Sequence, residues 1–125
     1  MPLAYWCVLV AALLPLFWAG YAKAGGEVDN HYPRESADDL PPKPRRAYAA
    51  HHNAYENFPF FAAAVIIAVT QGATISTVNA LAIVYVALRV VHGVLYVANQ
   101  STARSAVYGL ALLANIAIFV LPAFK

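Results

Sequence analysis

Charged residues are scarce in this chain of 125 residues, where they make up only 11%. An ordinary soluble domain has about a quarter of its residues charged. Apolar residues make up 62%. A water-soluble fold of that composition would expose large apolar patches, so we expect the main solvent to be lipid. The net charge of +2 is small and scattered along the chain, which excludes nucleic acid as a partner.

Cysteine is nearly absent as well. The single cysteine, Cys7, lies inside an apolar run. An internal disulfide is therefore excluded, and no Cys-x-x-Cys spacing exists for a metal or redox site. Because a reactive thiol needs an electropositive setting, we interpret Cys7 as a small residue for packing or lipid contact.

Long apolar segments predict an all-α membrane protein, a four-transmembrane-helix bundle in a single domain, residues 1–125. The predicted helices cover about residues 2–22, 47–70, 75–98 and 103–122. These runs are too long for the strands of a membrane barrel, and they do not alternate. The first run has an alternative interpretation as a secretory signal peptide rather than a membrane span, because Ala22-Lys23-Ala24 resembles a signal-peptide cleavage site. No basic residue precedes that run, however, and it is long for a signal peptide.

Residues 23–46 are polar and rich in proline, which predicts a surface loop between the first two helices. Loops rich in Lys and Arg remain on the cytoplasmic side of a membrane. Loops one and three carry most of the basic residues, namely Lys23, Arg34, Lys43, Arg45, Arg46 and Arg104. We therefore expect loops one and three in the cytoplasm and both termini on the opposite side.

Three groups of polar residues fall in the predicted helices or directly beside them, all near the cytoplasmic end. They are Arg46, Asn53, Glu56 and Asn57; Arg89, His92 and Tyr96; and Arg104, Ser105 and Tyr108. Each group lies near one face of its helix. A lone Arg or Glu well inside a bilayer costs roughly 2.5–3.5 kcal/mol. We therefore expect Glu56 to pair with Arg89 or Arg104, inside a polar pocket between the helices.

Two other interpretations of these polar groups stay open. An intramembrane Glu–Arg pair can simply lock helices together. A metal site made of His52, Glu56 and His92 is the second, although the chain has no HExxH or paired ExxH pattern to support a metal. We interpret His51 and His52 as residues of the membrane interface.

The segment 46–61 resembles the second-helix signature of the MAPEG family, the membrane-associated proteins in eicosanoid and glutathione metabolism. The most specific part is the pair Asn53-x-x-Glu56, followed by the aromatic-Pro-aromatic group Phe58-Pro59-Phe60. The resemblance continues through the polar groups of the third and fourth helices and covers nearly the whole chain. The chain looks closest to the small bacterial members.

The resemblance implies a homotrimer in the bilayer of a bacterial inner membrane, with glutathione bound as co-substrate between protomers. The implied activity is that of a glutathione-dependent transferase or peroxidase acting on lipophilic electrophiles. The implied glutathione-binding residues are Arg46, Asn53, Glu56, Arg89, His92 and Tyr96. Arg104, with Ser105 or Tyr108, would be catalytic and lie beside the sulfur, because a guanidinium favours thiolate over thiol.

Two positions depart from the family pattern. Glutathione-using relatives generally have an Arg where this chain has Ala49, and many have a basic residue where it has His52. An Arg that pairs with a carboxylate contributes about 1.5–3 kcal/mol. The alternative is therefore a non-catalytic MAPEG-like protein with a structural or lipid-binding role. A channel or transporter ranks third, because polar groups do not continue through the whole span.

Overall fold

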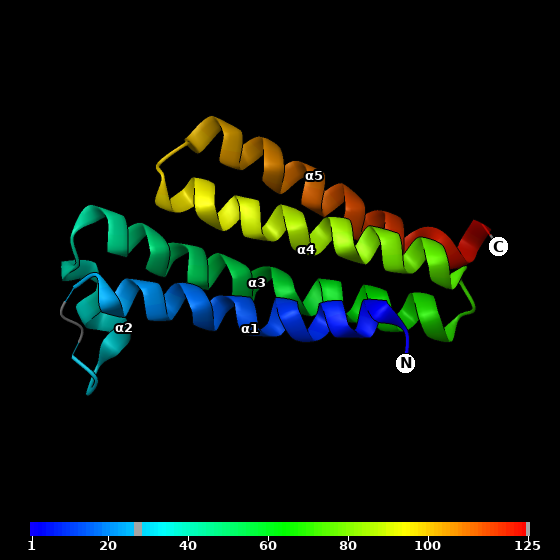
Figure 1. Cartoon of the computed structure of the whole chain (residues 1–125), viewed down its shortest axis with the longest axis horizontal. Helices are drawn as coiled ribbons and strands as arrows, with labels where there is room; N and C mark the ends of the chain where they lie inside the picture. The colour runs from blue at the N-terminus through cyan, green and yellow to red at the C-terminus, as the bar shows by residue number, and fades with distance from the viewer. Residues whose placement is uncertain (27–28, 125) are drawn as a thin grey trace.

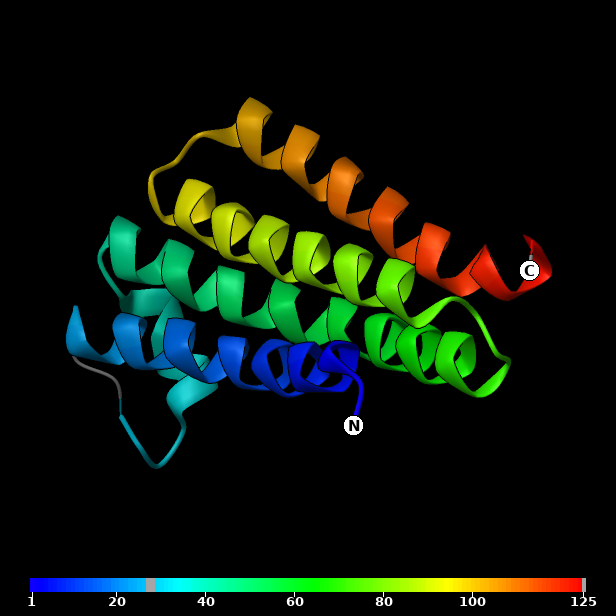
Figure 2. The same ribbon diagram turned by 45° about the vertical axis from the view of Figure 1, so that its right-hand side comes forward.

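The computed structural model describes residues 1–26 and 29–124, and every regular element in these two ranges is helical. The long helices are α1 (Leu3–Ala24), α3 (Pro42–Thr70), α4 (Ile75–Val97) and α5 (Ser101–Val120). The short ones are α2 (Pro33–Ser36) and the 3₁₀ helices η1 (Ala37–Asp39) and η2 (Leu121–Phe124). The long helices run up and down the molecule side by side (Figures 1 and 2). The predicted all-helical fold is confirmed.

Three of the long helices are long and apolar enough to cross a membrane: α1, α4, and α5 with its extension to Phe124. Their outer faces carry large exposed apolar side chains, among them Phe17 at 61% exposure and Leu113 at 63%. Such surfaces are unfavourable in water and favourable in lipid. The helix α3 has 29 residues, but the charged and polar side chains of its first half set it apart from the other three. A helical membrane bundle is therefore supported, with three candidate spans.

The arrangement of the helices gathers the polar residues at one end. The segment between α1 and α3 lies at the same end of the bundle as the turn between α4 and α5 (Figure 1). The turn between α3 and α4 lies at the opposite end. The start of α3, the end of α4 and the start of α5 therefore meet, as the sequence predicts.

Small residues fill much of the core. The buried alanines of the main core are Ala4, Ala11, Ala64, Ala68, Ala73, Ala82, Ala111 and Ala114. Small side chains let helix backbones approach closely, as is common in membrane bundles. Between α3 and α4, the rings of Phe61 and Tyr85 stack with their centroids 4.1 Å apart. These contacts hold α3 and α4 together in the middle of the bundle, away from the polar end.

The segment between α1 and α3 differs from the expected surface loop. The helix α3 begins at Pro42 rather than near residue 47, with Pro41 at its N-cap. Proline suits the first helical position because its missing N–H has no helical partner there. Ala37 and Leu40 are buried in a second cluster that includes Trp18. Part of this segment therefore packs onto the bundle.

The turn between α4 and α5 has a defined geometry. Asn99 has a φ of 62°. The N–H of Gln100 donates to the carbonyl of Leu95 at 2.9 Å, and the N–H of Asn99 donates to that of Tyr96 at 3.1 Å. This is the Schellman pattern that ends a helix. Asparagine tolerates the left-handed conformation better than other residues with a side chain.

Replacing Asn99 by valine is expected to destabilise the protein by about 1–2 kcal/mol, because a branched side chain resists the left-handed conformation. Asn99→Gly is the matched control and should be at least as stable as the parent. Thermal unfolding in detergent, followed by circular dichroism, measures both. Equal stability of the valine and glycine variants would contradict the assigned turn.

A close approach of α1 and α4 occurs at Gly93. A Cβ atom at this position would overlap the indole ring of Trp18, which is only 5% exposed. Gly93→Ala should therefore lower the free energy of unfolding by about 1–3 kcal/mol through overpacking. In the matched control Gly109→Ala, the added Cβ meets nothing within 4 Å. The same unfolding assay should show Gly109→Ala to be no less stable than the parent, and similar losses in both variants would contradict the tight contact.

Candidate functional site

A cavity of about 200 Å³ lies at the polar end of the bundle. It is lined by Asn53 from α3, His92 and Tyr96 from α4, and Arg104, Ser105 and Tyr108 from α5. All six were among the residues selected from the sequence. The structure therefore brings six of the nine candidates together around one space, which three helices enclose.

Hydrogen bonds join the three helices behind this cavity. Arg89 Nη2 donates to Asn53 Oδ1 at 2.6 Å. Asn57 Nδ2 donates to the Asn53 carbonyl at 2.8 Å, and the Tyr108 hydroxyl donates to Asn57 Oδ1 at 3.2 Å. Arg89 is only 4% exposed, so an amide oxygen serves as the partner of a buried cation. These bonds fix the side chains of Asn53 and Tyr108 in the cavity wall.

Arg104 is held by an aromatic ring. Its Cζ lies 4.2 Å from the ring centroid of Tyr96, a geometry in which the ring face attracts the cation. The side chain is partly exposed, and among the described residues no carboxylate forms an ion pair with it. The guanidinium donors therefore remain available to an anion in the cavity.

His92 forms part of the cavity wall and is only 2% exposed. Its ring centroid lies 5.9 Å from that of Tyr96 and 5.9 Å from that of Tyr108. The imidazole is therefore packed between two phenol rings, one from its own helix and one from α5. The rings of His92, Tyr96 and Tyr108 therefore form one continuous part of the cavity wall.

The expected ion pair of Glu56 is wrong. Glu56 is exposed, and in the described part of the chain no ion pair joins it to Arg89 or Arg104. Its neighbour Asn57, one helical step of about 100° away, points inward instead, and Asn53 takes the place of the carboxylate beside Arg89. Partly buried amides thus replace the acid that the sequence pattern suggested.

Arg46 also lies outside the cavity lining. Its Nε donates to the carbonyl of Val97 at 3.1 Å, where the end of α4 has free carbonyl groups. His51 is buried, and its Nδ1 lies 2.8 Å from the carbonyl of Pro15. Both side chains tie α3 to a neighbouring helix. Asn57 is not among the predicted site residues, although its place on the polar face of α3 could have indicated it.

The alternative metal site is not formed. His52 and Glu56 are exposed, whereas His92 is buried. Within residues 1–26 and 29–124, no three His, Cys, Asp or Glu side chains lie close enough to hold a metal ion. The cavity instead presents phenols, a hydroxyl, an amide and a guanidinium.

A comparison with protein-family models matches residues 3–124 to the MAPEG family. The chain belongs to the MAPEG family. The match extends over the four long helices and every cavity residue, so the resemblance seen in the segment 46–61 is confirmed. No curated protein and no solved structure matches the chain. The protein is therefore an integral membrane protein of a family linked to glutathione and eicosanoid metabolism.

Proposed function

We propose that this MAPEG protein is a glutathione-dependent transferase or peroxidase that acts on lipophilic electrophiles dissolved in the membrane. The observation that carries the proposal is Arg104, a cation in the wall of a polar cavity that has no counter-ion within residues 1–26 and 29–124. A neighbouring guanidinium favours thiolate over thiol, and the thiolate is the nucleophile. The start of α5 adds a positive partial charge close to Arg104.

The three catalytic candidates take different parts in this proposal. Arg104 and Ser105 supply donors to the sulfur. The hydroxyl of Tyr108 already donates to Asn57, so its proton is not free for the sulfur. Tyr108 is therefore a positioning residue that closes the cavity, and its oxygen can still accept one hydrogen bond from the ligand.

The size of the cavity favours an assembly of several protomers. At about 200 Å³, it is smaller than the roughly 300–1,000 Å³ of usual ligand pockets. One protomer can therefore hold the thiol end of glutathione, with the rest of the tripeptide lying against a neighbour. The exposed Glu56 supports this, since an uncovered Glu within a bilayer costs roughly 2.5–3.5 kcal/mol. We propose a homotrimer in which α3 is the fourth span and neighbouring protomers cover its polar face.

Calorimetric titration of the detergent-solubilised protein with glutathione tests the function. We expect saturable binding, together with a thiolate absorbance in the ultraviolet difference spectrum. S-methylglutathione is the control, because it should bind without the thiolate signal. Absence of binding at millimolar glutathione would overturn the proposal, and a native mass other than three chains would overturn the trimer.

The second candidate is a non-catalytic MAPEG-like membrane protein with a structural or lipid-binding role. Ala49 is the observation in its favour, because it removes a cation that glutathione-using relatives generally have. A protein of this kind would retain the bonds between Arg89, Asn53 and Asn57 for stability alone. It would give no heat with glutathione in the titration above.

A further inference from the structure

A second cavity lies in the groove between α1 and α4, on the face of α4 that points away from the candidate site. Its volume is about 360 Å³, and its walls include Phe17, Trp18 and Tyr21 from α1 and Val94 and Val97 from α4. Val94 is two residues from His92, which at 100° per residue places it on nearly the opposite side of the helix. The two cavities therefore share a helix but not a wall.

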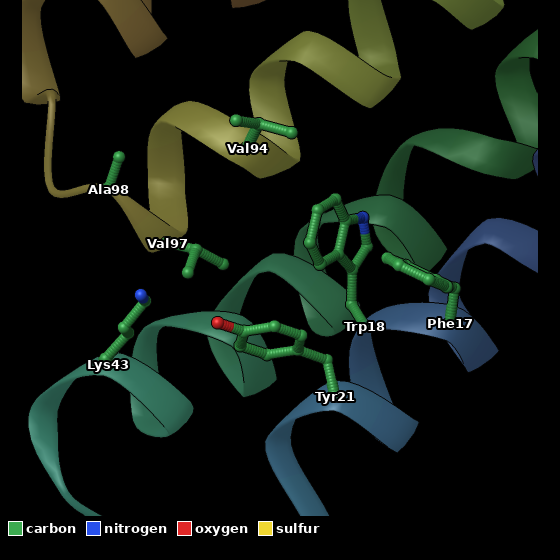
Figure 3. Close-up of a pocket in the computed structure, with 7 residues that line it drawn as sticks. All are labelled: Phe17, Trp18, Tyr21, Lys43, Val94, Val97 and Ala98. Carbon is green, nitrogen blue, oxygen red and sulfur yellow. The ribbon is translucent and has the colours of Figure 1, made fainter. Parts of the chain in front are cut away.

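The chemistry of this second cavity changes along its length. Figure 3 shows the phenol oxygen of Tyr21 and the ammonium group of Lys43 toward one end, and the rings of Trp18 and Phe17 toward the other. The side chain of Val94 lies above the indole of Trp18 in the same view. The groove is thus apolar at one end and polar at the other, which suits an amphiphile.

Lys43 provides the charge at the polar end. Its side chain is exposed, and among the described residues no hydrogen bond or ion pair involves its ammonium group. A third cavity of about 290 Å³ adjoins this end and has Tyr21, Lys43, Gly25 and Pro44 among its lining residues. Tyr21 and Lys43 line both cavities. In the described part of the chain this ammonium therefore has no counter-ion, and it lies where the groove and the third cavity meet.

We propose that these two adjoining cavities bind one anionic phospholipid. One acyl chain occupies the groove over Trp18 and Val94, and the phosphate lies against the ammonium of Lys43. A basic side chain next to the bilayer attracts anionic lipid, and Trp and Tyr side chains prefer the depth of the lipid head groups. A fatty acid would leave the third cavity empty, and a second copy of the chain would have to bring a carboxylate to Lys43. The site does not depend on glutathione.

Fluorescence quenching of Trp18 provides the test. The chain has two tryptophans, so the variant Trp6→Phe leaves Trp18 as the single emitter. The protein is reconstituted into phosphatidylcholine vesicles that contain a small fraction of either dibrominated phosphatidylglycerol or dibrominated phosphatidylcholine. Bromine quenches indole on contact. Because Trp18 is only 5% exposed, we expect little quenching by bulk lipid and stronger quenching by the brominated phosphatidylglycerol.

Two matched variants locate the charge that selects the lipid. Lys43→Gln should weaken the apparent affinity for phosphatidylglycerol about fivefold, the factor that corresponds to about 1 kcal/mol per basic residue near the surface. Arg45→Gln removes an exposed charge nearby that lines neither cavity, and it should leave the affinity unchanged. Equal effects of the two variants, or equal quenching by both lipids, would overturn the proposal.

The same assay tests the apolar end of the groove and the two alternative occupants, a fatty acid and a second copy of the chain. Val94→Phe should abolish the preference for phosphatidylglycerol by filling the groove. Val94 is 52% exposed, so the larger side chain should leave the fold intact by circular dichroism. A preference that survives Val94→Phe would overturn the proposal. Quenching by a brominated fatty acid equal to that by the brominated phosphatidylglycerol would also overturn it. So would the absence of quenching by either lipid, which would show that a second copy of the chain covers Trp18. Glutathione titration of Lys43→Gln should match that of the parent, which keeps this test separate from the proposed function.

Discussion

Replacing Arg104 by alanine is expected to lower kcat for glutathione conjugation by about 10²- to 10³-fold, the usual effect of removing one donor to a developing anion. The guanidinium is the cation in the wall of the polar cavity that has no counter-ion among the described residues. Without it, the pKa of bound glutathione should rise toward that of the free thiol. Steady-state kinetics with a lipophilic electrophile, together with the thiolate absorbance, measure the two effects.

The control for this variant is Arg104→Lys, which keeps a charge but loses the planar guanidinium that lies over the ring of Tyr96. It should recover part of the activity and part of the thiolate signal. Size-exclusion chromatography checks that both variants assemble like the parent. Full activity of Arg104→Ala would show that another group activates the thiol.

Replacing Asn53 by leucine is expected to lower the free energy of unfolding by about 1.5–3 kcal/mol, the range for a lost hydrogen bond to a charged group. The substitution removes the oxygen that accepts from Arg89 at 2.6 Å and leaves a guanidinium that is 4% exposed without its partner. Unfolding in mixed micelles with increasing sodium dodecyl sulfate measures the loss.

The double variant Asn53→Leu with Arg89→Leu is the informative comparison. Removing both partners leaves no unpaired charge, so the double variant should be more stable than Asn53→Leu alone. A non-additive cycle of this kind identifies a direct interaction. Additive losses would mean that Arg89 finds another partner, such as water in the cavity.

The sequence predicted the helices well because long apolar runs leave few alternatives in lipid. It also predicted the cavity residues, because a period of 3.6 residues and the order of the helices place Asn53, His92 and Arg104 at one end. The start of α3 was less predictable. Proline is common in loops and also at the first turn of a helix, so composition alone did not distinguish the two at Pro42.

Other features depend on rotations that a pattern cannot specify. Glu56 and Asn57 differ by one helical step, and the sequence did not show which of them faces inward. Electrostatics favoured the acid, whereas the packed helix has the amide there. The groove beside Trp18 was also missed, since an aromatic residue near the end of a predicted span is consistent with simple lipid contact. Its lining comes from three helices, and only their packing brings Lys43 next to Tyr21.

The short link between α4 and α5 has a consequence for the orientation of Arg104. The Schellman bonds at Asn99 and Gln100 tie the end of α4 to the turn, and the N–H of Arg104 donates to the carbonyl of Gln100 at 2.9 Å. These bonds therefore fix the rotation of α5 about its own axis relative to α4. One inserted residue would turn the face of α5 by about 100° and swing the guanidinium toward the acyl chains. The three-residue length of the connector, residues 98–100, thus determines the direction in which the side chain of Arg104 points.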